Sequence, residues 1–144
     1  MGLHISPSNC FLIYKNMASL HSRIQSSFQL TLQVAEFLQG HGVPTTFVGL
    51  PEHPDHERMT QFFFGGKGPS VLTFTVNKSK SEVISWLKQE QYFPYETSFG
   101  SAYSKLDPWP QFISKNKTRI RLSIGYQEQL PDLVQRLSQL LNLE

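Results

Sequence analysis

The stretch that most constrains the fold runs from Arg119 to Gly125 and reads Arg-Ile-Arg-Leu-Ser-Ile-Gly. Arg119, Arg121 and Ser123 alternate with three aliphatic residues, and this period of two predicts a strand with one apolar and one polar face. Apolar residues at helical spacing follow from about 129 to 141. Two arginines on one strand face have two interpretations: they lie on a solvated sheet surface, or a guanidinium binds a carboxylate or phosphate. The pattern alone leaves both open.

Composition limits the class of protein. The 144 residues are 39% hydrophobic and 17% charged and include eleven Phe, which suffices for one globular domain with its own core. A net charge of +2 with dispersed Lys and Arg predicts no nucleic-acid partner. Cys10 is the single cysteine, so we expect neither an internal disulfide nor a thiolate metal cluster. No run is apolar enough for a membrane span and Met1 to His4 do not begin a signal peptide, so we expect a cytoplasmic protein.

The N-terminal part of the sequence predicts helices. A serine followed by proline is typical of a helix start, and we expect a helix from about 7 to 18. Apolar residues at helical spacing predict a longer helix from about 20 to 39. The break between these two helices is compatible with a mere kink. A strand is expected at 43–49, and Pro54 is expected to open a further helix.

The remainder predicts strands alternating with helices. Such a chain forms an α/β fold, here a small, mostly antiparallel sheet of about four strands with helices on one face. We expect a single unit over 1–144, with 1–42 as an N-terminal helical segment and 43–144 as the α/β sandwich. The expected elements are a strand at 71–76, a helix at 78–89, a strand at 92–99, a helical turn at 102–106, a rigid loop at 107–110, a strand at 119–125 and a helix at 129–141.

Two other motifs are weak as ligand sites. His53, Asp55 and His56 are potential metal ligands, but three ligands are few for a metal site. Because a helix is expected to open at the proline after His53, the three side chains need not point toward one metal ion. The Gly-Gly-Lys-Gly run from Gly65 to Gly68 lacks the spacing of a phosphate-binding loop and a helix after it. We therefore expect no metal site, and a flexible turn at the glycines.

Five short motifs occur in a fixed order along nearly the whole chain. In order and spacing they resemble motifs in the C-terminal third of the trans-sulfuration family of pyridoxal-phosphate enzymes, which includes cystathionine γ-synthase, cystathionine β-lyase, cystathionine γ-lyase and methionine γ-lyase. The motifs are Gly2 to Leu20 with Ser6-Pro7, Leu12 and Ile13; Arg23-Ile24 followed by Val34-Ala35-Glu36-Phe37-Leu38 and His41; Gly49-Leu50-Pro51 with His53-Pro54 and His56; Ser98-Phe99-Gly100; and Arg121-Leu122-Ser123-Ile124-Gly125.

The resemblance implies both a fold and a site. The fold is that of the C-terminal domain of fold-type I pyridoxal-phosphate enzymes. In the family, the arginine of the "R-L-S-x-G" motif pairs in bidentate fashion with the α-carboxylate of the substrate, and the serine of "S-L-G" stands beside it. Carried over, Arg121 is the carboxylate clamp and Ser98 is its neighbour. No family role transfers to Arg119, which keeps the solvated interpretation.

The chain also departs from the family pattern. Leu30 stands where the family has asparagine, Lys15 replaces an arginine and Asn16 replaces a glycine. The histidine-proline pair after "S-L-G" appears as Asp107-Pro108. The "Y-P-G-L" string has become Phe47-Val48-Gly49-Leu50. We therefore expect a divergent member whose substrate preference has drifted.

The cofactor site of the family has no counterpart in this sequence. Pyridoxal-phosphate chemistry needs a Schiff-base lysine, a phosphate-binding loop and an aspartate against the pyridine nitrogen, which in the family lie in an upstream large domain. None of the eight lysines has the family's "S-x-T-K" setting: Lys15, Lys67, Lys78, Lys80, Lys88, Lys105, Lys115 and Lys117. The chain alone is expected to bind no cofactor and to hold no catalytic residue.

Two functions remain for such a chain. In the first, it is the C-terminal domain of a trans-sulfuration enzyme acting on a sulfur amino acid, inactive until a large-domain chain completes it. In the second, it is a non-enzymatic interaction module that binds a paralogue or a second copy through its former domain interface. Whether the purified protein is yellow separates the two hypotheses.

Overall fold

The computed structural model describes residues 4–143, except for the side chains of 109–113. Sequence expectations that concern residues 1–3, including the start of the first family-like motif, lie outside the described part. The elements are α1 (Pro7–Met17), α2 (Leu20–Gly40), β1 (Thr45–Thr46), α3 (His56–Phe62), the 3-10 turn η1 (Phe64–Gly66), β2 (Val71–Val76), α4 (Lys80–Glu90), β3 (Lys105–Ser114), β4 (Lys117–Ser123) and α5 (Leu130–Leu141).

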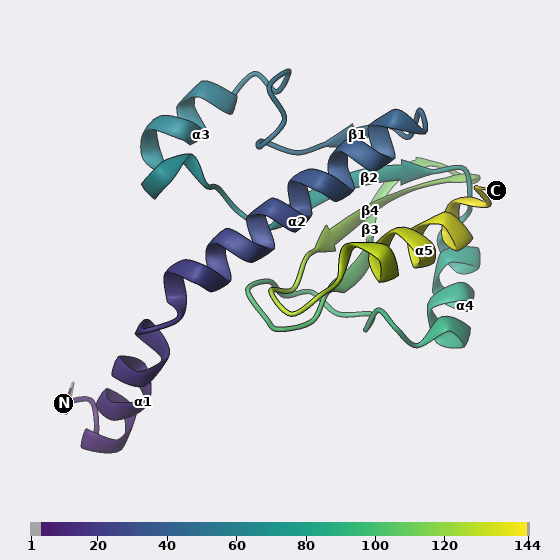
Figure 1. Ribbon diagram of the computed structural model, residues 1–144. Coiled ribbons are helices and arrows are strands. Elements are labelled where there is room, and N and C mark those ends of the chain that lie inside the picture. Colours follow the sequence, from purple (N-terminus) through teal and green to yellow (C-terminus); the bar gives the residue numbers. More distant parts are fainter. Residues whose placement is uncertain (1–3, 144) are drawn as a thin grey trace.

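A four-stranded antiparallel sheet in the order β1-β2-β4-β3 forms the centre of the fold (Figure 1). Alternate residues of β2 are buried, and in β4 Ile120 and Leu122 are buried while Arg119 and Arg121 lie on the other face. The expected sheet and the expected strand with two faces are therefore confirmed. Ser123 departs from the alternation, because it is buried at the end of β4, where it pairs with both Val71 and Lys105.

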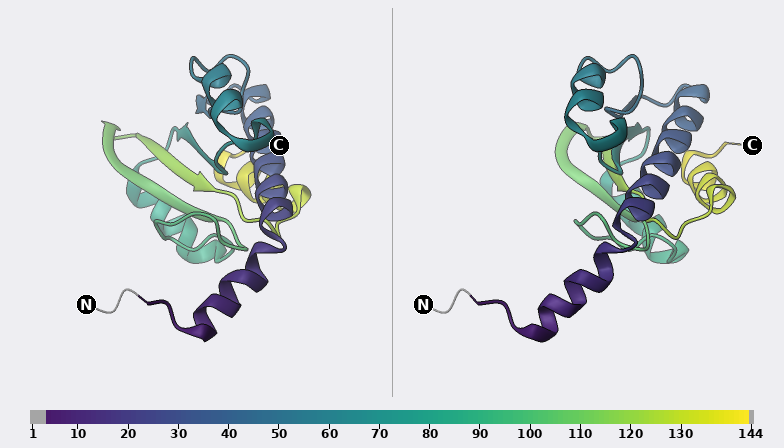
Figure 2. Two further views of the ribbon diagram at one scale, coloured as in Figure 1. Left: turned by 90° about the vertical axis from the view of Figure 1, so that its left-hand side faces the viewer. Right: turned by 60° about the vertical axis from the view of Figure 1, so that its left-hand side comes forward.

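Helices cover the apolar face of this sheet. Figure 2 shows α2 and α5 together on one side of the strands, and α4 contributes Val83 and Leu87 to the same core. In α5, Leu133, Leu137 and Leu140 are fully buried, since a spacing of three and four residues places them on one helix face. Burying each such leucine stabilises the fold by roughly 1.5–3 kcal/mol.

One strand lies elsewhere than the sequence analysis placed it. The segment expected as a strand, 92–99, is irregular, and the strand beside β4 is instead β3. This strand includes the expected rigid loop at 107–110 and the last two residues of the helical turn expected at 102–106, whose first three residues form a bend and coil rather than a helix. Pro108 would weaken a central strand, but β3 lies at the sheet edge, where a missing backbone donor is tolerated. The register also shifts between Pro108 and Phe112.

Other boundaries are corrected by small amounts. The expected strand 43–49 shortens to β1, because a turn begins at Val48. Helix α3 begins at His56 rather than at Pro54. The helix expected at 78–89 is confirmed as α4, whose start is fixed by a capping box in which Ser79 and Glu82 exchange hydrogen bonds.

The N-terminal helix α1 stands apart from the rest of the molecule. In both views of Figure 2 it extends away from the sheet, and it buries no residue. A turn at Ala18 and Ser19 separates it from α2, so the break is more than a kink within one helix. Beyond this turn, α2 enters the core with Val34, Ala35 and Leu38.

Candidate functional site

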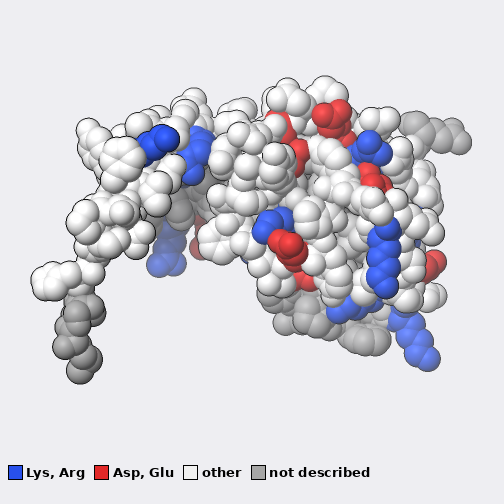
Figure 3. All heavy atoms as spheres, turned by 90° about the horizontal axis from the view of Figure 1, so that it is seen from below, with Lys and Arg blue, Asp and Glu red and all other residues white. Residues whose placement is uncertain are grey.

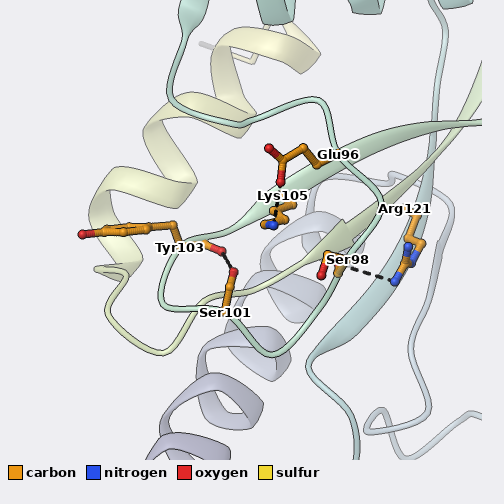
Figure 4. A network of polar contacts seen from close by, with 6 residues as sticks. All are labelled: Glu96, Ser98, Ser101, Tyr103, Lys105 and Arg121. Atoms are coloured by element: carbon orange, nitrogen blue, oxygen red, sulfur yellow. Dashed lines mark hydrogen bonds and ion pairs between the residues drawn. The ribbon is translucent and has the colours of Figure 1, made fainter.

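Arg121 projects from the open face of the sheet (Figure 4). In the antiparallel register it lies between Thr73 of β2 and Asp107 of β3. Its neighbours Ile120 and Leu122 are fully buried on the opposite face, so β4 holds the Cα of Arg121 rigidly. The side chain itself is only partly buried. A guanidinium held this way is positioned by the core yet accessible from solvent.

The described contacts of Arg121 leave most of its donors available. Its Nη2 donates to the backbone carbonyl of Ser98 at 3.5 Å, a long hydrogen bond. Its Cζ lies 5.8 Å from the centre of the Phe99 ring, within range of a cation–π interaction. Among the described residues no carboxylate forms an ion pair with Arg121. Ser98 is thus beside Arg121, as expected, but it makes contact through its carbonyl rather than its hydroxyl.

Arg119 lies two residues before Arg121 on the same face of β4. Its cross-strand neighbour in β2 is Thr75, and its side chain is exposed. No ion pair to Arg119 is found within the described residues. The two arginines therefore differ in surroundings: Arg121 has the Ser98 and Phe99 segment over it.

The glycine that ends the "R-L-S-x-G" motif has a steric role. A Cβ on Gly125 would lie 2.2 Å from the carbonyl oxygen of Ala102 and 2.5 Å from the carbonyl carbon of Tyr103. Only glycine permits this approach. Gly125 therefore lets the segment that carries Ser98 and Phe99 pass directly beside the end of β4.

An apolar pocket that no sequence motif predicted adjoins this site. It has a volume of about 440 Å³, and Phe99 and Gly100 belong both to its lining and to the segment beside Arg121. Arg23 and Lys67 are also part of the lining, whereas none of the described residues that line it is Asp or Glu. Because its residues come from four distant segments, no local pattern could reveal it. Apolar side chains in the lining include Leu20, Ile24, Phe63, Phe64 and Tyr126.

The histidine motif does not assemble a metal site. His53 Nδ1 accepts a hydrogen bond from the backbone N–H of Asp55 at 3.1 Å. His56 Nδ1 lies 3.2 Å from the carbonyl of Val48. Between residues 4 and 143 no group of three or more His, Cys, Asp or Glu side chains could hold a metal ion.

Surface charge is distributed without a dominant patch on the face shown in Figure 3. Basic and acidic side chains are interspersed there, and large areas carry neither. None of the helices within the described residues is long and apolar enough to cross a membrane.

Comparison with known proteins identifies the family to which this chain belongs. Residues 1–142 match the profile of the Cys/Met metabolism PLP-dependent enzyme family. Cystathionine gamma-lyase of Macaca fascicularis is 30% identical over 98% of this chain and 38% of its own length. Cystathionine beta-lyase of Schizosaccharomyces pombe is 29% identical over 90% of this chain and 33% of its own length.

A solved structure agrees with the sequence matches. The putative O-acetylhomoserine (thiol)-lyase of Campylobacter jejuni, solved with a pyridoxyl-lysine monophosphate, superimposes with a TM-score of 0.77. The match has 25% identity and covers 98% of this chain and 34% of that one. The protein therefore belongs to the Cys/Met metabolism PLP-dependent enzyme family. It spans well under half the length of the relatives that it matches.

Proposed function

We propose that this chain is the substrate-carboxylate-binding domain of a cytoplasmic PLP-dependent trans-sulfuration enzyme that acts on a sulfur amino acid. The observation that carries the proposal is the state of Arg121. Its backbone is fixed by the core, while its guanidinium makes one long hydrogen bond among the described residues. Such a fork of donors matches an α-carboxylate in bidentate geometry.

The neighbouring side chains support a carboxylate rather than a purely structural role. The Phe99 ring limits the movement of the Arg121 guanidinium on one side and leaves the N–H donors of the guanidinium free for a ligand. Ser98 lies at the mouth of the site and is itself exposed. In the proposed enzyme, Arg121 orients the substrate by its carboxylate, and Ser98 and Phe99 limit how the bound amino acid can turn.

The residues of this chain do not fit the cofactor. Pyridoxal phosphate needs a lysine, donors for its phosphate and a carboxylate facing the pyridine nitrogen. Lys105 is paired with Glu96 at 2.6 Å, and Lys78 donates to Asn142 at 3.1 Å. Lys67 and Arg23 both line the apolar pocket, but no described residue of this lining has a carboxylate that could face the pyridine nitrogen. We therefore propose that the cofactor is held by the part of the enzyme that this chain does not represent.

Borohydride reduction tests this division of roles. After incubation of the purified chain with pyridoxal phosphate, reduction should yield only scattered, substoichiometric adducts on exposed lysines. Peptide mass mapping measures their positions and their yields. A single stoichiometric adduct at one lysine would show that the chain holds the cofactor by itself.

A second candidate function is a non-enzymatic interaction module, favoured by one specific observation. The apolar arm, which we define as the exposed apolar residues of α1 and the start of α2, offers a surface for a partner. Its members are Phe11, Leu12, Ile13, Tyr14, Met17, Leu20 and Ile24, each at least 43% exposed. Contiguous apolar surface of this kind marks interaction sites. In both candidate functions the arm docks onto a partner: the large domain of the enzyme in the first, a paralogue or a second copy in the other.

A further inference from the structure

We propose that Glu128 is a positioning residue for the carboxylate site, because its carboxylate fixes both ends of the loop that carries Ser98 and Phe99. We refer to residues 92–104 as the site loop. The inference rests on the proposed function of Arg121 and adds to it a residue that contacts neither the substrate nor Arg121. Glu128 lies between β4 and α5, far from the site loop in sequence.

The two oxygens of Glu128 bind opposite ends of the site loop. At its first residue, the Tyr92 hydroxyl donates to Oε2 of Glu128. At its last residue, the backbone N–H of Ser104 donates to Oε1 of Glu128 at 2.5 Å. One side chain thus binds the loop at both ends. A hydrogen bond accepted by a carboxylate is stronger than one between two neutral groups.

Tyr92 is itself held in place by Arg136 and Glu90. The Arg136 guanidinium lies 5.5 Å from the centre of the Tyr92 ring, and its Nη1 pairs with Glu90 Oε1 at 3.1 Å. Glu90 Oε2 accepts the backbone N–H of Tyr92 at 2.9 Å. Burial, and then the hydrogen bond to Glu128, raise the pKa of the Tyr92 hydroxyl far above its usual range. A tyrosine hydroxyl is protonated at neutral pH in any case, and the raised pKa keeps the Tyr92 hydroxyl a proton donor toward Glu128 at alkaline pH as well.

The end of the site loop at Ser104 is hydrogen-bonded to the segment that follows β4, residues 124–129. The Ser104 hydroxyl accepts the backbone N–H of Gly125 at 3.1 Å, and the carbonyl of Ala102 accepts that of Gln127 at 3.0 Å. Ser104 is fully buried. These bonds lie only a few residues beyond Arg121, so the end of the site loop and the arginine share one rigid support.

The apex of the site loop has few bonds of its own. Phe99 is 69% exposed, and the carbonyl of Ser98 contacts the sheet through the long hydrogen bond from Arg121. The remaining described side-chain bonds of the apex region are local, from Ser101 to Tyr103 and from Lys105 to Glu96. Two backbone bonds also hold the loop, from the Leu106 N–H to the Pro94 carbonyl at 3.2 Å and from the Tyr126 N–H to the Ser101 carbonyl at 3.4 Å. The place of Ser98 and Phe99 over Arg121 is therefore set chiefly on either side of the apex, by these bonds and, at the two ends of the loop, by Glu128.

The test compares three variants of the purified chain by NMR. Glu128→Ala removes both bonds. Glu128→Gln is the conservative rescue, because its amide can accept from Ser104 and donate to the Tyr92 oxygen. Glu82→Ala is the matched control, since it removes a carboxylate and weakens the cap in the first turn of α4, at the end of the helix opposite to the site loop. For each variant, amide hydrogen exchange at Ser98–Ser101 and the binding of L-methionine at the Arg121 Nε–H are measured.

We expect Glu128→Ala to raise exchange at Ser98–Ser101 roughly tenfold and to weaken methionine binding by a similar factor, with both restored in Glu128→Gln and unchanged in Glu82→Ala. Methionine binding and loop exchange that are equal in Glu128→Ala and wild type overturn the inference and leave the proposed function intact. If the wild type shows no methionine-dependent shift, the proposed function fails. The inference is then decided by exchange alone: faster loop exchange in Glu128→Ala supports the positioning of the loop, and unchanged exchange overturns it.

Discussion

Helix α1 and helix α5 are similar in length and entirely different in environment. Helix α5 buries three leucines at intervals of four and three residues, whereas α1 buries none and exposes Phe11, Leu12 and Ile13 in succession. A helix whose partner is its own sheet needs one apolar face. Consecutive apolar residues on α1 cover several faces, which a single sheet could not bury. The difference shows that α1 does not pack into the core of this domain.

The largest expected effect contrasts these two helices in stability. Leu137→Ala leaves a cavity in a fully buried site and should lower the free energy of unfolding by about 2–5 kcal/mol. Phe11→Ala, on an exposed position, should change it by less than about 0.5 kcal/mol. Urea unfolding followed by intrinsic fluorescence measures both. A comparable loss in the two variants would show that α1 belongs to the folding unit after all.

A second prediction concerns the exposed helix α1 of this pair, whose apolar arm we expect to act as an interaction surface. We expect the isolated chain to self-associate at high concentration and to bind a hydrophobic dye, because the arm exposes contiguous apolar surface. Replacing Phe11 and Ile13 with serine should reduce both, while thermal stability is preserved. Light scattering and dye fluorescence measure the two effects. A wild type that stays strictly monomeric and binds no dye would argue against a docking role.

A smaller effect distinguishes the caps of α4 and α1. Ser79 caps α4, which packs on the core, and Ser6 caps α1 by accepting the N–H of Asn9 at 3.2 Å. Ser79→Ala should lower the free energy of unfolding by about 1 kcal/mol, as loss of an N-cap does. Ser6→Ala should leave the main transition unchanged and reduce only the helix content of the arm. Urea unfolding and circular dichroism separate the two outcomes, and equal shifts of the main transition would contradict the contrast.

Much of the fold was predictable because its periodic patterns agree with its packing. The alternation in β4 and the leucine spacing in α5 each specify one buried face, and both predictions are confirmed. The third strand was misplaced because the segments 92–99 and 105–114 both combine aromatic residues with proline. Which of them pairs with β4 depends on tertiary contacts of the site loop, such as those of Ser104, and no local pattern contains these.

The candidate site was predictable only in part. Alternation placed Arg121 on the polar face of its strand, and the family resemblance, rather than any physical pattern, distinguished it from Arg119. The Phe99 ring beside the guanidinium and the two bonds of Glu128 join segments more than twenty residues apart. Such contacts have no sequence signature in a single chain. They arise only because the fold places the site loop against the end of β4.

The most direct measurement is an NMR titration of L-methionine against wild type, Arg121→Lys and Arg119→Lys. In an open half-site water competes for the guanidinium, so we expect wild-type binding with a Kd on the order of millimolar. Arg121→Lys keeps the charge but loses the planar fork and should abolish binding, whereas Arg119→Lys should bind like wild type. Both variants should keep their thermal stability within about 0.5 kcal/mol. Equal binding by the two variants, or unfolding of Arg121→Lys, would contradict the assignment of Arg121 as the carboxylate-binding residue.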